Sequence, residues 1–397
     1  MSNLGESGRS FETVKEDLAR SILAAKKPAD LIVPLIYSIP VFAPVRICIE
    51  LGVFEHLSRS SVPLSADTLA KDLCGQTGQD AGNKSETCDF LVRMLRTVQA
   101  IGLVDEVAEF TYLANALTHT MAEPGFAAGF QLTFDNLTEP KSTISEMLKY
   151  HQANAWQVAA SANDGAWQRA RNAVGTSTFD SWVADDPIQL TRLNALMQRM
   201  QSDRLHWTEW FPENRLFHYA GRNPEQRMVV VDVGGGRGHD IKAFAKKYAQ
   251  APVSAILQDL RGTIEEARAE MQAAGIEVCV HDFFQPQPVR GADIYYMHKI
   301  MHDWPDEGCV RILEHLRDAM TPRSRILINE VILPNRGCSL LHACFDINML
   351  ALHSGRERDE ASWERLISQV EGLSIRKFWH APNDEGEGIV EVGLTNF

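Results

Sequence analysis

The chain has 397 residues and a formal net charge of −13 at pH 7. Hydrophobic residues make up 45% and charged residues 23%, which is ordinary for a folded globular protein and excludes a largely disordered chain. The acidic balance argues against general binding to nucleic acids or to anionic membranes, because Lys and Arg must neutralise their phosphates.

The length allows two or three domains at about 100–200 residues each. We expect a mostly helical, winged-helix-like dimerisation domain over 1–125, a helical connector over 126–227 that contributes to a substrate pocket, and an α/β domain over 228–397. Seven scattered cysteines without a CxxC pair favour reduced thiols and a cytoplasmic location. The polar N-terminus is unlike a signal peptide. The most apolar stretch, Leu31–Val45, contains three prolines and is too short to span a bilayer.

The N-terminal region is predicted to begin with helices. Leu31–Glu50 is apolar on nearly every face, so we expect a helix buried on several sides, against a partner subunit. Ser65 is suited to cap the next helix. The polar stretch Gly75–Asp89 is typical of a mobile loop. A second helix follows, with Phe90, Met94 and Val98 at helical spacing, and then two strand-like segments, 101–104 and 110–113.

This helix, turn, helix and hairpin order is a winged-helix pattern with two interpretations. One is DNA binding by a transcriptional regulator, and the other is a structural or dimerising domain. Between Leu51 and Phe110, five basic residues stand against nine acidic ones, a net charge of −4. That sign is wrong for a surface that faces phosphates, so we favour dimerisation and expect no nucleic-acid partner.

The middle of the chain is predicted to be helical. A stripe of Leu and Met residues follows Pro187, where a helix is expected to begin. Phe130, Phe134 and Trp156 are candidate pocket-lining aromatics, of which Phe134 is taken as a substrate contact. Packing in a core is the alternative for all three.

From residue 228 onward, apolar strands alternate with helices, which predicts a doubly wound, parallel Rossmann-like sheet. The last two strands are joined by a short turn and should be antiparallel. The expected strands are 229–233, 254–259, 276–280, 292–297, 325–333, 374–380 and 388–394, and the expected helices are 241–249, 263–274, 305–320 and 360–371.

A glycine-rich turn joins the first of these strands to its helix. It contains Asp232, Gly234, Gly236 and Gly238 in the order D-x-G-x-G-x-G. A dinucleotide fingerprint would need Gly or Ala at position 239, where this chain has His239. The pattern therefore suits a nucleoside without a pyrophosphate. It resembles motif I of the class I S-adenosylmethionine (SAM)-dependent methyltransferases.

Acidic residues also end the following strands. Asp259 lies 21 residues after Gly238, where a carboxylate can accept both ribose hydroxyls. The resemblance implies cofactor contacts for its neighbour Leu260, for Asp282 and Phe283 beside the adenine, and for His298, which stands where plant members carry Lys.

The segment His302-Asp303-Trp304 follows the fourth strand. Together with the glycine turn, it resembles the O-methyltransferases that include caffeic acid and flavonoid enzymes and many fungal natural-product enzymes, over nearly the whole chain. The resemblance implies that His302 is the general base, with Glu330 as the first acid that holds it and Glu357 as the second. It also implies substrate contacts for three further residues: Asp303, Met349 and His353.

The chemistry explains these residue types. SAM carries its methyl group on a positively charged sulfur, so the enzyme must align a nucleophilic oxygen with it. A phenol has a pKa near 10 and needs a base, which an imidazole with a pKa near 6.5 can supply. A carboxylate on the other ring nitrogen fixes the tautomer. We assign Glu330 to this role, with Glu357 in support, and expect no metal.

The sequence thus predicts a homodimeric, SAM-dependent O-methyltransferase that acts on an aromatic or enolic hydroxyl in secondary metabolism. The alternative is a related pericyclase or dehydratase, in which SAM is an electrostatic cofactor that is not consumed. No motif separates the two activities.

Overall fold

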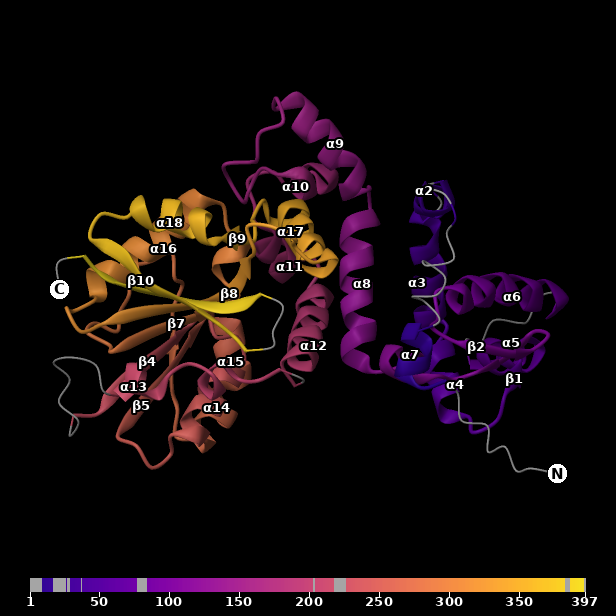
Figure 1. Cartoon of the computed structure of the whole chain (residues 1–397), viewed down its shortest axis with the longest axis horizontal. Helices are drawn as coiled ribbons and strands as arrows, with labels where there is room; N and C mark the ends of the chain where they lie inside the picture. Colours follow the sequence, from indigo (N-terminus) through magenta and orange to yellow (C-terminus); the bar gives the residue numbers. More distant parts are fainter. Residues whose placement is uncertain are drawn as a thin grey trace. The chain divides into compact units, whose positions relative to one another are not determined.

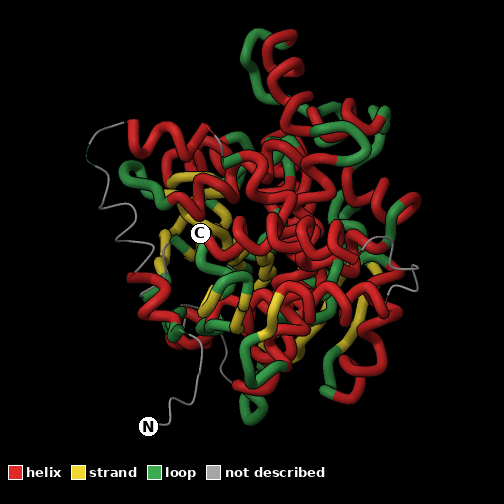
Figure 2. The backbone as a smooth tube through the Cα atoms, turned by 90° about the vertical axis from the view of Figure 1, so that its right-hand side faces the viewer, coloured by secondary structure: helices red, strands yellow, loops and turns green. Residues whose placement is uncertain are grey.

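The computed structural model describes residues 9–16, 26, 29–36, 38–76, 84–202, 204–217, 226–382 and 386–395. The chain forms two compact units (Figure 1). Unit 1 comprises residues 1–135 and 188–200, and unit 2 comprises residues 136–187 and 201–397. The expected connector, 126–227, is thus divided between the units. Helices are more abundant than strands (Figure 2), and none in the described ranges is long and apolar enough to cross a membrane.

Unit 1 is mainly helical. Its helices are α2 (Ala29–Ile36), α3 (Phe42–Glu50), α4 (Val53–Arg59), α5 (Ala66–Gln76), α6 (Lys84–Ala100), α7 (Ala116–Met121) and parts of α8 (Pro124–Thr138) and α12 (Ile188–Ser202). A three-stranded antiparallel sheet has the order β1-β3-β2, with β1 at Leu64–Ser65, β2 at Asp105–Ala108 and β3 at Thr111–Leu113.

The segment Leu31–Glu50 does not form one continuous helix. Helix α2 ends at Ile36, and a 3-10 turn with Pro40 near its start, η1 (Ile39–Val41), separates it from α3. Proline lacks the N–H that would continue a helix, which explains the break. In the single chain, Leu35 and Phe42 are 65% and 54% exposed, so their burial against a partner subunit remains a prediction.

The helices around the predicted loop begin and end close to it. Ser65 caps α5 as expected, because its Oγ accepts a hydrogen bond from the Thr68 N–H at 3.1 Å. Helix α6 starts at Lys84, so the second part of the predicted loop Gly75–Asp89 is helical, while 77–83 lie outside the described residues.

The first strand of the small hairpin is displaced from its predicted position. Residues 101–104 are the C-terminal turn of α6, where Gly102 has φ +83° and the N–H of Leu103 bonds to Val98 O at 2.9 Å. A glycine in the left-handed region ends helices in this way, so the strand begins only at Asp105. The winged-helix assignment itself remains a prediction.

Unit 2 contains the predicted mixed sheet. Its order is β10-β11-β8-β7-β4-β5-β6, with β9 paired to β8. The strands from β6 to β8 are parallel, and β11 runs antiparallel to β10, as expected. Strand β11 is also antiparallel to β8, which was not predicted. The bounds are β4 Met228–Val233, β5 Val253–Asp259, β6 Glu277–Val280, β7 Ile294–His298, β8 Arg325–Leu333, β9 Arg358–Asp359, β10 Leu373–His380 and β11 Glu387–Leu394.

Helices cover both faces of this sheet. Alternate residues of each strand face opposite sides. Val231 and Ile328 pack with α16 (Asp306–Ala319) and α18 (Glu360–Ser368) in one core. Val230 and Leu327 belong to the other core, with α14 (His239–Lys247) and α15 (Arg261–Ala273). The α/β Rossmann-like fold is therefore confirmed.

The remaining helices of this unit are α9 (Thr143–Ala153), α10 (Ala166–Arg171), α11 (Thr178–Asp185), the 3-10 turn η2 (Trp207–Glu209), α13 (Glu213–Phe217) and α17 (Leu340–His353).

Candidate active site

The glycine turn lies where β4 ends and α14 begins. Gly236 has φ +59°, and a side chain there would meet no atom within 4 Å, so one side of the turn is open. Gly238 has φ +79° and is the N-cap residue of α14. Gly238 also lies close to Met271, because a Cβ atom added to this glycine would be 2.6 Å from the sulfur of the methionine. Both positions have the left-handed backbone conformation that favours glycine.

Two acids flank this turn. Asp259 ends β5, and its carboxylate accepts hydrogen bonds from the N–H of Gly236 at 2.9 Å and from that of Leu260 at 2.7 Å. Asp232 is 1% exposed, and its burial together with nearby Asp240 raises its pKa well above the usual value. An open glycine turn between the buried carboxyl group of Asp232 and the half-buried one of Asp259 fits the ribose of SAM.

The other predicted cofactor residues gather at the same edge of the sheet. A Cβ atom on Gly234 would lie 3.3 Å from the ring of Phe283, which places that ring beside the turn. Asp282 accepts a hydrogen bond from the N–H of Phe284 at 2.9 Å. Leu260, the N-cap residue of α15, is 49% exposed.

His298 belongs to a buried polar network that the sequence did not reveal. Its Nδ1 lies 2.7 Å from Asp240 Oδ2, and its Nε2 lies 3.4 Å from Glu387 Oε1. His206 reaches the other oxygen of Asp240 at 3.3 Å. Burial lowers the pKa of His298, but the carboxylates outweigh it and raise that pKa to about 9. The charged imidazole is therefore held at the end of β7.

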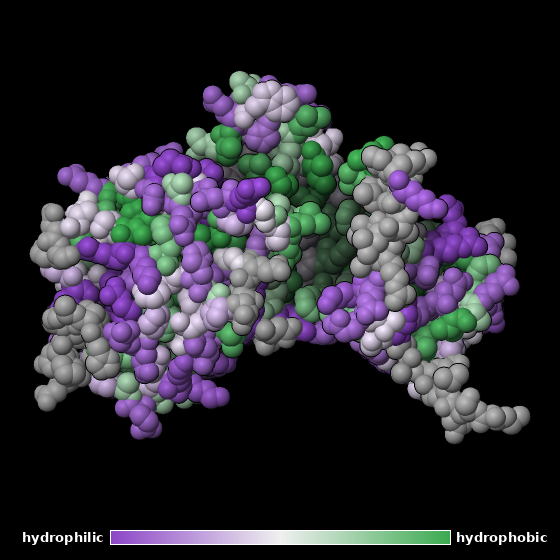
Figure 3. All heavy atoms as spheres, in the orientation of Figure 1, coloured by the Kyte–Doolittle hydropathy of each residue, from purple (hydrophilic) through white to green (hydrophobic). Residues whose placement is uncertain are grey.

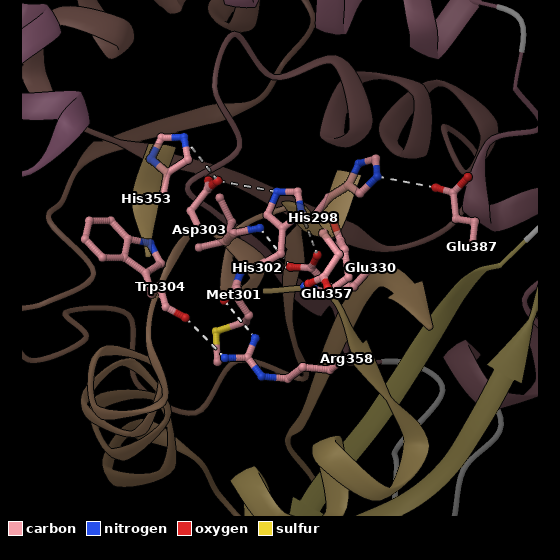
Figure 4. Close-up of polar contacts among 12 residues, drawn as sticks. His298, Met301, His302, Asp303, Trp304, Glu330, His353, Glu357, Arg358 and Glu387 are labelled. Atoms are coloured by element: carbon pink, nitrogen blue, oxygen red, sulfur yellow. Dashed lines mark hydrogen bonds and ion pairs between the residues drawn. The ribbon is translucent and has the colours of Figure 1, made fainter. Parts of the chain in front are cut away.

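His302 lies on the 3-10 turn η3 (Met301–Asp303), among three carboxyl groups (Figure 4). Its Nδ1 is 2.8 Å from Glu357 Oε1 and 3.6 Å from Glu330 Oε2. Its Nε2 is 3.6 Å from Asp303 Oδ1, beyond hydrogen-bond distance. The ring is thus fixed at Nδ1, while Nε2 has no direct hydrogen bond to Asp303.

The two glutamates have different contacts from those we expected. Glu357 makes the short hydrogen bond to the imidazole, whereas we had assigned that role first to Glu330. Glu330 instead accepts hydrogen bonds from the N–H groups of Ile300 and Met301, at 2.9 and 2.8 Å. It therefore holds the backbone that leads into the turn. Sequence spacing could not rank the two acids, because the difference lies in side-chain orientation.

These charges shift the pKa values of the whole group. Burial alone would lower the pKa of His302, but Glu330, Asp303 and Glu357 raise it to about 10. Burial raises the pKa of Asp303 to about 7, although His302 opposes the shift. His353, whose Nε2 lies 3.9 Å from Asp303, is buried beside His302, and its pKa falls to about 3. The charged imidazole of His302 and the neutral imidazole of His353 thus both lie beside the carboxyl group of Asp303.

The structure brings together only some of the predicted substrate contacts, namely Asp303 and His353. The ring of Phe179 on α11 stacks on His353, with centroids 4.8 Å apart. Met349 is half-buried on α17, and its backbone oxygen accepts a hydrogen bond from the N–H of Gly355. Phe134 lies in unit 1, stacked on Phe130 with centroids 6.3 Å apart. Their roles as acceptor contacts remain predictions.

His302, Glu330 and Glu357 also have the donor atoms that a divalent ion could use, within 4.8 Å of one another. The contact of 2.8 Å between His302 Nδ1 and Glu357 Oε1 is a hydrogen-bond length. The imidazole and this carboxylate therefore form a hydrogen-bonded pair.

Comparison with known proteins gives the family. Residues 155–372 match the family model of the O-methyltransferase domain. The chain is 32% identical over 380 residues to the O-methyltransferase asqD of Emericella nidulans, which covers 94% of this chain and 90% of asqD. Two solved structures have TM-scores of 0.81 and cover 97% of this chain and 94% of their own: LepI in complex with SAM at 27% identity, and a pericyclic reaction enzyme at 26%.

The family match, the related full-length chain and the glycine turn with its two acids agree on the cofactor. The chain belongs to the SAM-dependent O-methyltransferases of the fungal natural-product type.

Proposed function

We propose that this enzyme methylates a hydroxyl oxygen on an aromatic or enolic small molecule, with His302 as the general base. The observation that carries the proposal is the orientation of the imidazole, whose Nδ1 is held by Glu357 at 2.8 Å. Its Nε2 is 3.6 Å from Asp303 Oδ1, so in the deprotonated ring this nitrogen can receive a proton from a substrate.

The reaction needs few protein groups. Bound SAM supplies a methyl group on a positively charged sulfur. Nε2 of His302 takes the proton as the acceptor oxygen forms its bond to the methyl carbon and the bond from sulfur to that carbon breaks. Glu357 stabilises the imidazolium that results. Asp232 and Asp259 would hold the cofactor's polar groups.

The test is the variant His302→Ala. We expect methylation of a phenol panel to fall by about 100-fold to 10,000-fold, because a general base contributes that much, while SAM binding by calorimetry stays unchanged. His380→Ala is the matched control, since that imidazole is exposed on β10 and pairs with Glu360 at 3.0 Å. Undiminished turnover in His302→Ala would refute the assignment of the base.

One observation favours a second candidate, a pericyclic or dehydration reaction. With a pKa of about 10, His302 is an imidazolium at neutral pH before any cofactor binds. An imidazolium donates a hydrogen bond and can polarise a substrate oxygen instead of removing its proton. A structural relative is described as a pericyclic reaction enzyme.

The stoichiometry of the reaction separates the two candidates. Methyl transfer releases one S-adenosylhomocysteine for each molecule of product, whereas a rearrangement releases none. The direction of the pH dependence differs too. Methyl transfer should accelerate as pH rises toward 10 and His302 loses its proton, while a reaction that uses the imidazolium should slow down over the same range.

A further inference from the structure

Four consecutive residues, Gly355–Arg358, touch the turn that carries His302. The N–H of Arg356 donates a hydrogen bond to the backbone oxygen of His302 at 2.9 Å. The side chain of Glu357 bonds the imidazole of the same residue. Backbone and side chain of His302 are therefore both held by neighbouring residues of one short segment.

Arg358 holds both sides of the turn at once (Figure 4). This residue is 1% exposed, and its Nη1 donates to the backbone oxygen of Met301 at 3.0 Å. Its Nη2 donates to the backbone oxygen of Trp304 at 3.1 Å and to Asp306 Oδ1 at 2.7 Å. The two carbonyl groups bracket His302 and Asp303. A planar guanidinium can bridge them in a fixed geometry, which the single ammonium group of Lys cannot reproduce.

Gly355 allows the segment to come this close. A Cβ atom at this position would lie 2.0 Å from the backbone oxygen of His302 and 2.9 Å from the carbonyl carbon of Asp303. Gly355 is not among the residues with positive φ, so an alanine would fit its backbone conformation. The glycine is therefore required by contact with the turn alone.

The segment is also fixed to the sheet. Arg358 begins β9, which pairs with β8 so that Arg358 lies opposite Ile332. Glu330, which holds the N–H groups of Ile300 and Met301, is two residues earlier on β8. The turn is thus bound from two sides by groups attached to the same strand.

We propose that Gly355–Arg358 acts as a clamp that sets the imidazole of His302 against Glu357, with Arg358 as a positioning residue for the base. The proposal rests on the function proposed above, in which His302 accepts the proton. Loss of the clamp should move the turn away from Glu357. The consequences are a lower pKa of His302 and, because the ring is misplaced, a lower kcat even where His302 is deprotonated, while the cofactor still binds at the glycine turn.

The test compares Arg358→Lys and Gly355→Ala with two matched controls. Arg317→Lys alters an arginine on α16 that also binds a carboxylate and a backbone oxygen, those of Asp318 and Glu371. Gly393→Ala alters a glycine on β11 whose added Cβ would lie nearest to the flexible side chain of Arg376, 2.8 Å from its Nε. The readouts are the pKa of His302 from NMR of histidine-labelled protein, SAM affinity by calorimetry, and kcat and KM with a phenol panel. The His302 signal is assigned by its loss in His302→Gln.

We expect the pKa of His302 to fall by about one unit or more in both clamp variants. We expect kcat to fall by about 100-fold, since a shift of 1 Å can cost that much, with KM, SAM affinity and both controls unchanged. If either clamp variant fails to fold, Asp306→Asn replaces it, because Asp306 is 39% exposed and contacts Arg358 from the solvent side. Asp306→Asn should also lower the pKa of His302 and kcat, but by less than the clamp variants do.

An unchanged His302 pKa and an unchanged kcat in the folded clamp variants would overturn the proposal. If His302→Ala is inactive in the same experiments, the base assignment stands and only the clamp is wrong. If His302→Ala is fully active, the proposed function fails, and the NMR measurement still reports separately whether the clamp positions the ring.

Discussion

At the scale of single residues, the site depends on which carboxylate faces the imidazole. Glu357 accepts the hydrogen bond from His302, while Glu330 accepts two backbone N–H groups. An amide can replace Glu330 as the acceptor of these two bonds, because its carbonyl oxygen still accepts both. An amide cannot replace the charge that Glu357 places beside the imidazolium.

The two glutamine variants should therefore differ. Glu357→Gln should lower kcat about 100-fold, as expected for an impaired general base, and Glu330→Gln by less than about tenfold. Steady-state kinetics with SAM and a phenolic acceptor measure both. A greater loss in Glu330→Gln than in Glu357→Gln would return the leading role to Glu330, as the sequence spacing had suggested.

The raised pKa of His302 has a consequence for stability. Its folded pKa is about 10 and its ordinary value is 6.5, so between these pH values the folded protein keeps a proton that the unfolded chain releases. The free energy of unfolding should therefore fall as pH rises from about 6.5 to about 10. His298, with a pKa of about 9, adds to the fall.

Urea denaturation at several pH values, compared between the wild type and His302→Gln, isolates this contribution. The variant should lose less stability over the window, because it lacks the proton that His302 retains. Equal slopes in both proteins would show that the imidazole is not held charged.

Much of the site could be predicted from sequence at this scale, since Asp232, Asp259 and His302 lie at or just after the ends of β4, β5 and β7, which are neighbours in the sheet. The ranking of Glu330 and Glu357 could not, because it depends on side-chain direction. Asp240, His206 and Arg358 were missed. Their partners are distant in sequence, and no local pattern marks a buried charge pair.

At the scale of elements, strand β11 depends on one buried carboxylate. Glu391 has 0% exposure and accepts hydrogen bonds from Arg215 at 2.7 Å, Arg325 at 3.3 Å and Trp379 Nε1 at 2.9 Å. Three elements, α13, β8 and β10, thus meet at this residue. Its removal leaves the guanidinium of the buried Arg325 without this negative charge.

Glu391→Leu should destabilise the protein by about 3–5 kcal/mol, the usual cost of breaking a buried ion pair from one side. Glu391→Gln retains acceptor and donor groups of similar shape and should cost less. Chemical denaturation measures the difference. A loss in Glu391→Leu no larger than that of an exposed substitution would contradict the role of this carboxylate.

Elements with a strong apolar pattern were predictable. Strand β8 has the bounds expected from its run of buried residues, and the turn between β10 and β11 indicated their antiparallel pairing. Helix α17 was missed, and Leu340, Leu341 and Ile347 on it are more than half exposed. Apolar residues lie on the exposed side of this helix as well as on its buried side. The sequence therefore lacks the separate apolar and polar faces from which a half-buried helix is predicted.

At the scale of the whole molecule, exposed apolar residues suggest a second copy of the chain. Figure 3 shows apolar side chains at the surface of unit 2 near α17, where Leu340 is 81% exposed. Contiguous apolar surface of this kind usually marks an interaction site. The predicted homodimer should sediment with twice the 44.4 kDa mass of one chain. A monomer mass at micromolar concentrations would contradict it.

The central claim is that an imidazole faces the methyl group of SAM across the acceptor site. A crystal structure with bound SAM tests it most directly. The account predicts that the methyl group points toward the space beside Nε2 of His302, with the ribose hydroxyls on Asp259. A methyl group directed away from His302, or a nucleoside bound far from the glycine turn, would contradict it.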